Sequence, residues 1–359
     1  MPRRVAIVYN EPNPSRYDRT HEEKAVLGVL EAVAAVHRSL LEMGDAVTLL
    51  PLLPPFETAR RELAALEVEV VFNLFEGFCG EPETEALVPE ALEELGLPYT
   101  GCRAGVLRLA LDKPRVKVMM QAAGIITPDF QLINPGTLPS FHLKYPCVVK
   151  PSGEDASHGI TADSFVNDSQ ALERQVKTVT ESYGKDALVE EFVGGREFNA
   201  TVMGNSRYVV LPVSEIVYTL PPGIPRILTF AAKWDTGSPY YYHTKVACPA
   251  EITGREREYI AGTAMAAFRL LRCRGYARVD MRLDEKGKLN LFEVNPNPDI
   301  SPDTGAARQA EAAGMTYTEF VRKIVKFALE PKKDGRQNPP DDRRRQAGAD
   351  ADAEKYARI

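Results

Sequence analysis

The sequence predicts an α/β fold that begins with a doubly wound parallel sheet, and two patterns along the chain support this. The first hundred residues alternate between short apolar runs, typical of buried strands, and longer segments with apolar residues at helical spacing. Short connections between them predict repeated β-α units with helices on both faces of the sheet. From about residue 106 the pattern changes, and strands alternate with polar loops, which predicts a separate, smaller α+β unit followed by further strands.

The N-terminal segment is expected to alternate strictly between strands and helices. The expected strands are 4–9, 46–50, 69–74 and a short one at 99–101, and the expected helices are 22–43, 57–66 and 83–95. Gly44 and Gly96 follow two of these helices, in the position where a left-handed residue commonly ends a helix. Ligands of such sheets bind beyond the carboxyl ends of the strands, which directs attention to residues 10–14 and 73–81.

The rest of the chain predicts a more varied set of elements. The expected helices are 106–123, 169–183, 256–271 and 316–329, and the expected strands are one after Pro128 and those at 146–150, 187–192, 198–203, 208–214, 277–283 and 289–295. The helix at 106–123 is expected to continue through Pro114. Residues 331–359 are rich in charge with few large apolar residues, and we expect a disordered tail there.

The composition excludes several classes of protein. The chain has 359 residues, of which 44% are hydrophobic and 26% charged, as in ordinary globular proteins. Its net charge of −6 argues against general nucleic-acid binding. No apolar run approaches the roughly 18 residues that cross a membrane, and the five cysteines form no CxxC pair. We therefore expect a cytoplasmic protein with reduced thiols and with neither a membrane nor a nucleic-acid partner.

The most informative segment is a polar hairpin at 277–303. Alternation along a strand places Arg278 and Asp280 on one face of the first strand, and Glu293 and Asn295 on one face of the second. Across an antiparallel pair these four groups converge. Two carboxylates and an amide oxygen are hard ligands that suit Mg²⁺, and an adjacent arginine can neutralise an anion held by that metal. The alternative is a surface hairpin whose polar residues face solvent.

One lysine and the loop after it predict an anion site, and two further lysines lie in other settings. Lys150 ends the apolar strand PCVVK and precedes the loop 151–159 (PSGEDASHG), whose composition is that of a phosphate-covering lid. Lys113 lies on a helix, and Lys233 lies in the loop FAAKWDTG. An exposed turn is the alternative for the loop 151–159. GxGxxG and GxxxxGK[ST] are absent, which argues against a simple Rossmann cofactor site and a Walker-type P-loop.

The segment 188–198 (LVEEFVGGREF) predicts a strand, a glycine turn and the start of a second strand. Its acidic side chains can bond an adenine amino group or ribose hydroxyls, and the backbone of residues 191–193 can read the adenine edge. A plain edge hairpin is the alternative.

Together these motifs resemble the ATP-grasp superfamily and, within it, the branch of D-alanine–D-alanine ligase-like carboxylate–amine ligases. The resemblance covers about residues 70–329, and its best stretches are LGLPYTGC, LALDKPRVKVMMQAAGIITP, YPCVVKPSGEDASHG, LVEEFVGGREF, AKWDTGSPYYYHTKVACPA and GYARVDMRLDEKGKLNLFEVNPNPDIS. It implies a three-domain ATP-grasp fold, a homodimer, and ATP and Mg²⁺ as cofactors, with Mn²⁺ as a substitute for Mg²⁺. The implied parts are an N-terminal Rossmann-like substrate domain (1–105), a central subdomain with a glycine-rich lid (106–197), a C-terminal mixed-sheet subdomain with the Mg²⁺ site (198–330) and the tail (331–359).

The resemblance also implies roles for individual residues, carried over motif by motif. The implied ATP-binding residues are Lys113, Lys150, Ser157, Glu190, Phe192, Val193 and Glu197. The implied metal ligands are Asp280, Glu293 and Asn295. Arg278 resembles the arginine that stabilises the acyl phosphate and the tetrahedral intermediate, and Lys233 resembles the lysine that closes on ATP. Glu23 is the match to the glutamate that holds the ammonium of the first amino acid.

The acceptor side departs from the pattern of the D-alanine ligases. Asn295 is followed by PNPD instead of a segment ending in Pro-Gly, so Asp299 stands where the family has a glycine near the substrate. A carboxylate there repels an incoming carboxylate or attracts a cationic group. The first lid serine is replaced by Ala156, and a histidine-glycine loop is replaced by NLFEG at 73–77.

We therefore expect an ATP-dependent ligase that joins a small-molecule carboxylate to an amine, such as amino acids or peptides, through an acyl phosphate, with an acceptor different from that of the D-alanine ligases. An ATP-grasp small-molecule kinase and a non-catalytic ATP-binding regulator are the alternatives. The sequence identifies no general base for the amine.

Overall fold

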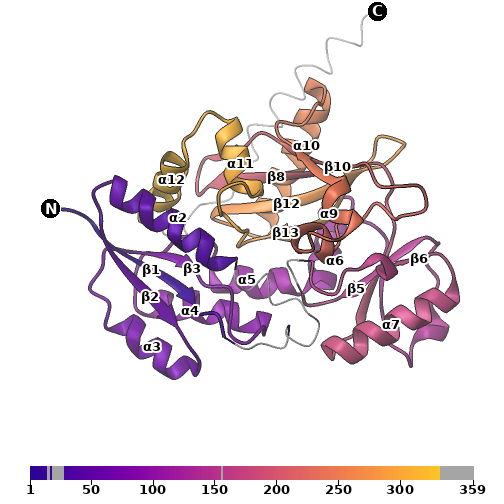
Figure 1. Cartoon of the computed structure of the whole chain (residues 1–359), viewed down its shortest axis with the longest axis horizontal. Helices are drawn as coiled ribbons and strands as arrows, with labels where there is room; N and C mark the ends of the chain where they lie inside the picture. The colour runs from indigo at the N-terminus through magenta and orange to yellow at the C-terminus, as the bar shows by residue number, and fades with distance from the viewer. Residues whose placement is uncertain (14–16, 18–27, 155–156, 332–359) are drawn as a thin grey trace, which may run out of the picture. The chain divides into compact units, whose positions relative to one another are not determined.

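Three β-sheets organise the described part of the chain, each built from a different stretch of the sequence (Figure 1). The coordinates are those of a computed structural model, which describes residues 1–13, 17, 28–154 and 157–331. Glu23, Ala156, the beginning of the helix expected at 22–43 and nearly all of the tail expected at 331–359 lie outside the described residues.

The first sheet has the strand order β2-β1-β3, and both pairs are parallel. Its strands are β1 (Arg4–Asn10), β2 (Ala46–Leu52) and β3 (Val70–Leu74). Alternate side chains of β1 pack into two different cores, because one face of the sheet is covered by α2 (Val29–Glu42) and α12 (Tyr317–Leu329), and the other by α3 (Phe56–Ala64) and α4 (Leu87–Glu94). The predicted doubly wound parallel sheet is therefore confirmed. Tyr99 adds only an isolated parallel bridge to Val71, where a short strand was expected.

The second sheet has the order β4-β7-β5-β6, and its pairs are antiparallel. Its strands are β4 (Phe130–Ile133), β5 (Cys147–Pro151), β6 (Phe165–Val166) and β7 (Ala187–Glu191). Helix α7 (Ser169–Tyr183) packs its apolar side on this sheet and has the bounds that the sequence predicts. It begins where the side chain of Asp168 accepts the Ala171 N–H, and it ends at Gly184, which adopts a left-handed φ of 66°.

The third sheet has the order β11-β10-β8-β12-β13, with β9 paired to the far end of β8. Its strands are β8 (Arg196–Gly204), β9 (Tyr208–Val210), β10 (Ser214–Tyr218), β11 (Thr244–Ala247), β12 (Gly275–Leu283) and β13 (Leu289–Asn295). All of these pairs are antiparallel, where the resemblance implied mixed directions. The single strand expected at 208–214 is divided into β9 and β10, which pair with successive parts of β8. Helix α10 (Gly254–Leu270) covers the apolar face.

Several helices differ from expectation. The helix expected at 106–123 is two helices, α5 (Ala104–Leu111) and α6 (Lys113–Ala122), so the prediction of a continuous helix was wrong. The ring of Pro114 excludes a preceding helical turn, and the side chain of Asp112 accepts the Arg115 N–H and caps α6 instead. Lys233 lies on a short helix, not in a loop. The remaining helices among the described residues are η2 (Pro82–Ala86), η3 (Leu138–Ser140), η4 (Ala162–Ser164), α8 (Phe230–Trp234), α9 (Pro239–His243) and α11 (Gly305–Ala312).

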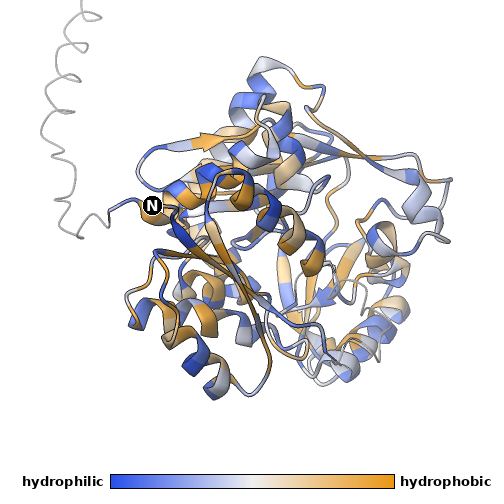
Figure 2. Cartoon of the chain, turned by 60° about the vertical axis from the view of Figure 1, so that its left-hand side comes forward, coloured by the Kyte–Doolittle hydropathy of each residue, from blue (hydrophilic) through white to orange (hydrophobic). Residues whose placement is uncertain are grey.

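Apolar packing joins the last helix to the first sheet. Figure 2 shows apolar strands in the interior and helices that are apolar on one side and polar on the other. Helices α2 and α12 lie side by side over the first sheet, and the Thr318 hydroxyl donates to Glu42 Oε2 at 2.6 Å. Among the described residues, no helix combines the length and apolar character needed to cross a membrane. The five cysteines are free.

The turn between β7 and β8 depends on Gly195, and we expect Gly195→Ala to lower the free energy of unfolding by more than about 2 kcal/mol. Gly195 has a φ of 93°, and an added Cβ would lie 2.1 Å from the carbonyl oxygen of Leu283. Gly194→Ala is the matched control, because an added Cβ at Gly194 meets nothing within 4 Å. Urea unfolding of the two variants checks this, and equal stability would contradict it.

Candidate active site

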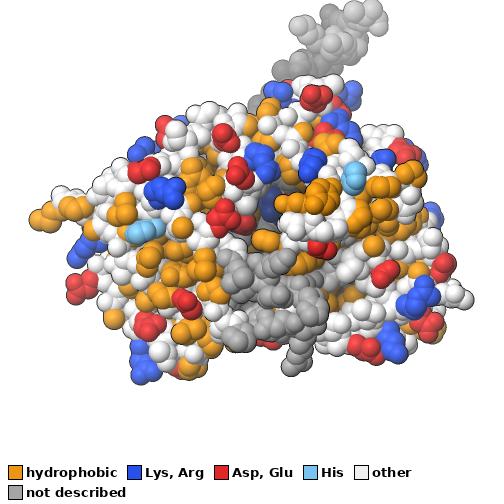
Figure 3. All heavy atoms as spheres, in the orientation of Figure 1, with side chains coloured by type: hydrophobic (Ala, Val, Ile, Leu, Met, Phe, Trp, Pro, Cys, Tyr) orange, Lys and Arg blue, Asp and Glu red, His pale blue; other side chains and the backbone are white. Residues whose placement is uncertain are grey.

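A cavity of about 790 Å³ lies where the polar face of the third sheet meets loops that follow the other two sheets. Figure 3 shows a hollow near the centre of the face in view, with basic side chains inside it and acidic side chains along its margin. Every sequence-predicted site residue that the structure describes lines this cavity. Glu23, the other predicted site residue, lies outside the described residues.

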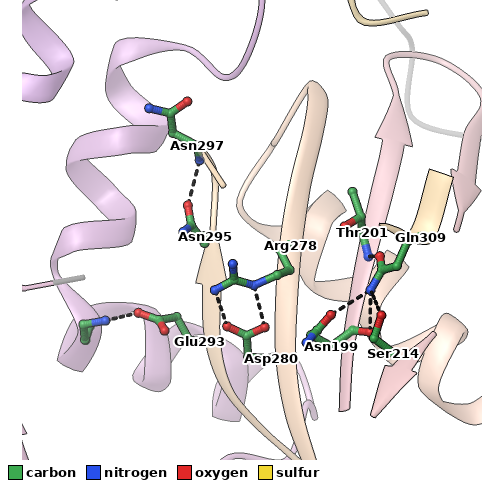
Figure 4. A network of polar contacts seen from close by, with 10 residues as sticks. Asn199, Thr201, Ser214, Arg278, Asp280, Glu293, Asn295, Asn297 and Gln309 are labelled. Carbon is green, nitrogen blue, oxygen red and sulfur yellow. Dashed lines mark hydrogen bonds and ion pairs between the residues drawn. The ribbon is translucent and has the colours of Figure 1, made fainter. Parts of the chain in front are cut away.

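The hairpin β12–β13 brings four of these residues together. Arg278 lies opposite Asn295, and Asp280 lies opposite Glu293, so all four side chains share one face. Arg278 donates to both carboxylate oxygens of Asp280, from Nε at 2.8 Å and from Nη2 at 2.9 Å (Figure 4). Asn295 Oδ1 accepts the backbone N–H of Asn297 at 2.9 Å.

A β-bulge shapes this face. The β12–β13 register shifts between Asp280 and Met281, so that Glu293 and Leu291 face consecutive residues of β12. Phe292 is the extra residue of the bulge. As a result Phe292 and Glu293 both line the cavity, while Leu291 remains in the core.

Glu293 is ionised. Burial raises the pKa of Glu293, but the charges of Lys113 and Lys150 outweigh burial and lower it to about 2. The Lys113 ammonium donates directly to Glu293 Oε1. For Asp280, burial is the larger effect and raises the pKa, while Arg278 acts in the opposite direction.

A buried cluster of two lysines and one carboxylate forms the wall beside the second sheet. Lys150 Nζ lies 2.7 Å from Glu190 Oε2, and Lys117 Nζ lies 2.8 Å from Glu190 Oε1. The Lys117 contact is an ion pair without the direction of a good hydrogen bond, and Lys117 also donates to the Thr127 hydroxyl. Burial raises the pKa of Glu190, and the two lysines more than reverse this and lower it to about 2. Both carboxylate oxygens of Glu190 are thus already paired with lysines.

Arg282 organises the other end of the cavity, and the sequence reasoning missed it. Its guanidinium donates to Glu197 Oε2 from Nε at 3.0 Å and to the Val193 carbonyl oxygen at 3.0 Å. It also lies 5.0 Å from the centre of the Phe192 ring. Tyr218 donates to the same Glu197 oxygen at 2.6 Å. One arginine therefore fixes three residues of the expected nucleotide site.

Residues from three separate segments meet over the cavity. The Tyr17 hydroxyl donates to Glu154 Oε2 at 2.8 Å, and the Tyr17 ring stacks on His158 with 3.7 Å between ring centres. His158 also lies 5.5 Å from the ring of Phe230, at the start of α8. Ser157, beside His158, has a left-handed φ of 68°. The Tyr17 contacts join the expected lid to a segment that precedes it by more than a hundred residues.

The segment after β13 forms the end of the cavity away from Arg282. Asp299 accepts the backbone N–H of Ser301 at 2.8 Å and its hydroxyl at 2.7 Å. Asn297 Nδ2 donates to the Phe75 carbonyl oxygen at 3.2 Å and to Glu85 Oε1 at 2.6 Å. These bonds tie the segment to the loop that follows β3.

The donor set of the hairpin suits a hard cation. Among the described residues, no group of three or more His, Cys, Asp or Glu side chains forms a metal site. Asp280, Glu293 and Asn295 instead offer two carboxylates and one amide on one face of a hairpin. Mg²⁺ commonly takes one or two carboxylates and completes its coordination with water and substrate phosphates, so these residues fit it.

Comparison with known proteins gives a consistent result. The family model described as D-ala D-ala ligase C-terminus matches residues 119–326. The protein y4sG of Sinorhizobium fredii is 35% identical over 295 residues, which cover 81% of this chain and 83% of that protein. The D-alanine–D-alanine ligase B of Chromobacterium violaceum is 30% identical over 276 residues, which cover 75% of this chain and 84% of that ligase. The structure of the D-alanine–D-alanine ligase of Bacillus anthracis complexed with ATP shares the fold, with a TM-score of 0.69 at 19% identity, over 91% of this chain and 97% of that one.

The pKa of Glu190 predicts how stability depends on pH. Because this pKa is lowered from 4.5 to about 2 in the folded protein, the ionised group stabilises the fold above about pH 4.5 and this contribution is lost as the pH falls toward 2. We expect Glu190→Gln to flatten the fall in the free energy of unfolding between about pH 4.5 and 3, by up to about 1.4 kcal/mol per pH unit. Urea unfolding at several pH values measures this slope. Glu285→Gln, in the exposed turn of the hairpin, should keep the wild-type slope, and equal slopes for both variants would refute the role of Glu190.

Proposed function

This chain belongs to the D-alanine–D-alanine ligase family of ATP-dependent ligases that form C–N bonds, and from this premise we propose that it joins a carboxylate to an amine through an acyl phosphate. The observation that carries the proposal is the hairpin face. It places the carboxylates of Asp280 and Glu293 between the guanidinium of Arg278 and the ammonium of Lys113, in one cavity. Phosphoryl transfer needs such an arrangement of fixed charges around the transferred group.

At the nucleotide end, the adenine would lie against Phe192 and the backbone of Val193, and the ribose hydroxyls would bond Glu197. The contacts of Arg282 with all three residues support this proposal, since they hold the base and ribose positions in one rigid arrangement. Glu190 would act beside the base by holding Lys117 and Lys150 in place.

The phosphates would lie between the lysines and the lid. Lys113, Lys150 and Lys233 supply positive charge from three different elements, and Ser157 supplies a hydroxyl and a backbone N–H from the lid. Asp280, Glu293 and Asn295 would hold Mg²⁺, or Mn²⁺ in its place. The metal, when bound, supplies positive charge that offsets the charge of the transferred phosphoryl group.

In the proposed reaction, an oxygen of the substrate carboxylate attacks the γ-phosphorus and ADP leaves. The amine then attacks the carbonyl carbon of the acyl phosphate, and the phosphate leaves with the C–O bond electrons and takes up the proton that the nitrogen loses. In this proposal, the guanidinium of Arg278 would stabilise the oxygen that becomes negative in the second step. The contacts of Tyr17 with Glu154 and His158 would help to exclude water, which would hydrolyse the acyl phosphate.

We further propose that the amine acceptor differs from D-alanine. Asp299 lines the end of the cavity where we place the acceptor, together with Glu31 and Glu76. Burial raises the pKa of the nearby Tyr317 hydroxyl, and the negative charges of Asp299 and Glu31 raise it further. This field disfavours an acceptor with a free carboxylate at that point and favours a neutral or cationic group. The role of Glu23 and the homodimer both stay predictions from the family resemblance.

The ligase proposal predicts that Arg278→Ala and Glu293→Gln each lower kcat by about 10²-fold or more, because each removes charge at the reacting group. ADP release over pairs of acids and amines, with mass detection of the coupled product, measures this. Glu285→Gln on the exposed turn is the control and should keep full activity. Full activity in either Arg278→Ala or Glu293→Gln would contradict the assigned roles. Hydroxylamine trapping of an acyl phosphate separates a ligase from a kinase that phosphorylates a small molecule and stops.

Asp299 predicts a change in specificity. We expect Asp299→Gly to shift the preference among amine acceptors by about tenfold or more toward those with a carboxylate, because the repelling charge is removed. The dissociation constant of ATP should stay nearly unchanged, since Arg282 and Glu197 lie at the other end of the cavity. Competition between paired acceptors, with product ratios read by mass, measures the preference. A changed ATP affinity with an unchanged acceptor preference would contradict an acceptor-side role.

A further inference from the structure

A side-chain amide fills a gap in the third sheet directly behind the cavity. β8 pairs with β10 through residues 197–199 and with β9 through residues 202–204, and Gln309 of α11 lies between these two pairings. Its Oε1 accepts the N–H of Thr201 at 2.8 Å, and its Nε2 donates to the carbonyl oxygen of Asn199 at 3.0 Å (Figure 4). The amide of Gln309 thus makes the bonds that a strand backbone would make. Gln309 is fully buried.

The same amide fixes the side chain of Asn199. Gln309 Nε2 also donates to Asn199 Oδ1 at 2.7 Å and to Ser214 Oγ at 3.0 Å. The Thr201 N–H can only donate, so Gln309 must turn its oxygen toward it and its nitrogen toward Asn199. Because that nitrogen can only donate, the atom of Asn199 that meets it must be the oxygen. The backbone of β8 therefore determines the orientation of both amides.

This orientation leaves the Nδ2 of Asn199 as a donor at the cavity. Asn199 lines the cavity, and its Nδ2 has no partner among the residues that the structure describes. Asn199 lies directly opposite Asp280 in the β8–β12 register. Gly305, at the start of α11, lies against the side chains of Arg278 and Asn199. A Cβ added at Gly305 would be 3.6 Å from Arg278 Cδ and 3.7 Å from Asn199 Oδ1. Nδ2 is thus a second hydrogen-bond donor beside the Arg278–Asp280 pair.

We propose that Asn199 is a further catalytic residue, whose Nδ2 donates, together with Arg278, to the oxygen that becomes negative when the amine attacks the acyl carbon, and that Gln309 is its positioning residue. This rests on the proposed ligase function. A donor that is already oriented stabilises a developing charge without the cost of reorganisation. If Asn199 rotated by half a turn, its carbonyl oxygen would face that charge and repel it. Gln309 prevents this rotation.

The test of the catalytic role is Asn199→Ala, measured by ADP release and product formation. We expect kcat to fall by about 10²-fold, as for the loss of one oxyanion donor, with the dissociation constant of ATP nearly unchanged. Asn290→Ala is the matched control, because Asn290 is buried in β13 of the same sheet, donates to the Lys288 carbonyl oxygen and does not line the cavity. If the wild-type protein is active and Asn199→Ala has an unchanged kcat, the role of Asn199 is overturned and the ligase function is not. A wild-type protein that forms no product with any acid and amine overturns the ligase function, and the inference with it.

The positioning role is tested by a double-mutant cycle. If Gln309 acts through Asn199, Gln309→Ala lowers kcat by about tenfold or more in the wild type and has no further effect in Asn199→Ala. Gln309→Glu is a second variant, because its carboxylate keeps the shape of the side chain but requires a donor, so it turns Nδ2 of Asn199 away from the cavity and should match Asn199→Ala in kcat. Gln175→Ala, a buried glutamine in α7 that bonds Ser164, is the control for loss of a buried amide. Equal losses from Gln309→Ala in both backgrounds would overturn the positioning role.

Discussion

The register between β8, β12 and β13 is the constraint on which the rest of the site depends. Directly opposite residues of antiparallel strands share a face, so this register places Asn199 with Asp280, and Asp280 with Glu293. A slip by one residue would turn all of these polar groups into the apolar core and bring core residues to the cavity. Two features help to maintain this register. Gly195 precedes β8 at a point where there is no room for a side chain. The amide of Gln309 bonds the backbone of β8 where no neighbouring strand does.

Buried charges of opposite sign are paired along the cavity. Two ion pairs show this: Lys113 pairs with Glu293, and Arg278 pairs with Asp280. In each pair, the basic side chain is one expected to contact an anionic substrate group, and the carboxylate is one expected to bind the metal. An unpaired buried charge is costly, and exchanging one partner for another costs much less. Under the proposed function, a nucleotide that arrives with Mg²⁺ would supply both charges at once. We infer that binding exchanges partners within this face and creates no isolated charge, which favours joint binding of the nucleotide and the cation.

The sequence predicted the elements that depend on local patterns and missed those that depend on packing. The strand alternation at Arg278 and Asp280 identified one face of the hairpin, and continuing it by two residues would have included Arg282. Lys117 follows Lys113 by one helical turn, so the same helix face offered a signal for it. The bulge at Phe292 leaves no such signal, because the register depends on the partner strand. Gln309 was also beyond reach, since two of its four bonds are to backbone atoms of a distant strand.

The spacing of the polar residues on β12 has a consequence for how this enzyme can diversify. Arg278, Asp280 and Arg282 are two residues apart on one strand, so about 13 Å of pleated backbone separates the first from the last. This distance is fixed, because β12 is hydrogen-bonded to β8 on one side and to β13 on the other. Changes in the length or sequence of the loops at the two ends of β12 would alter which molecules are recognised. The spacing of Arg278, Asp280 and Arg282 would stay the same. A change of acceptor at one end of β12 is therefore compatible with unchanged nucleotide binding at the other end. An engineered variant that makes a different product would keep the residues of β12 and change the loops.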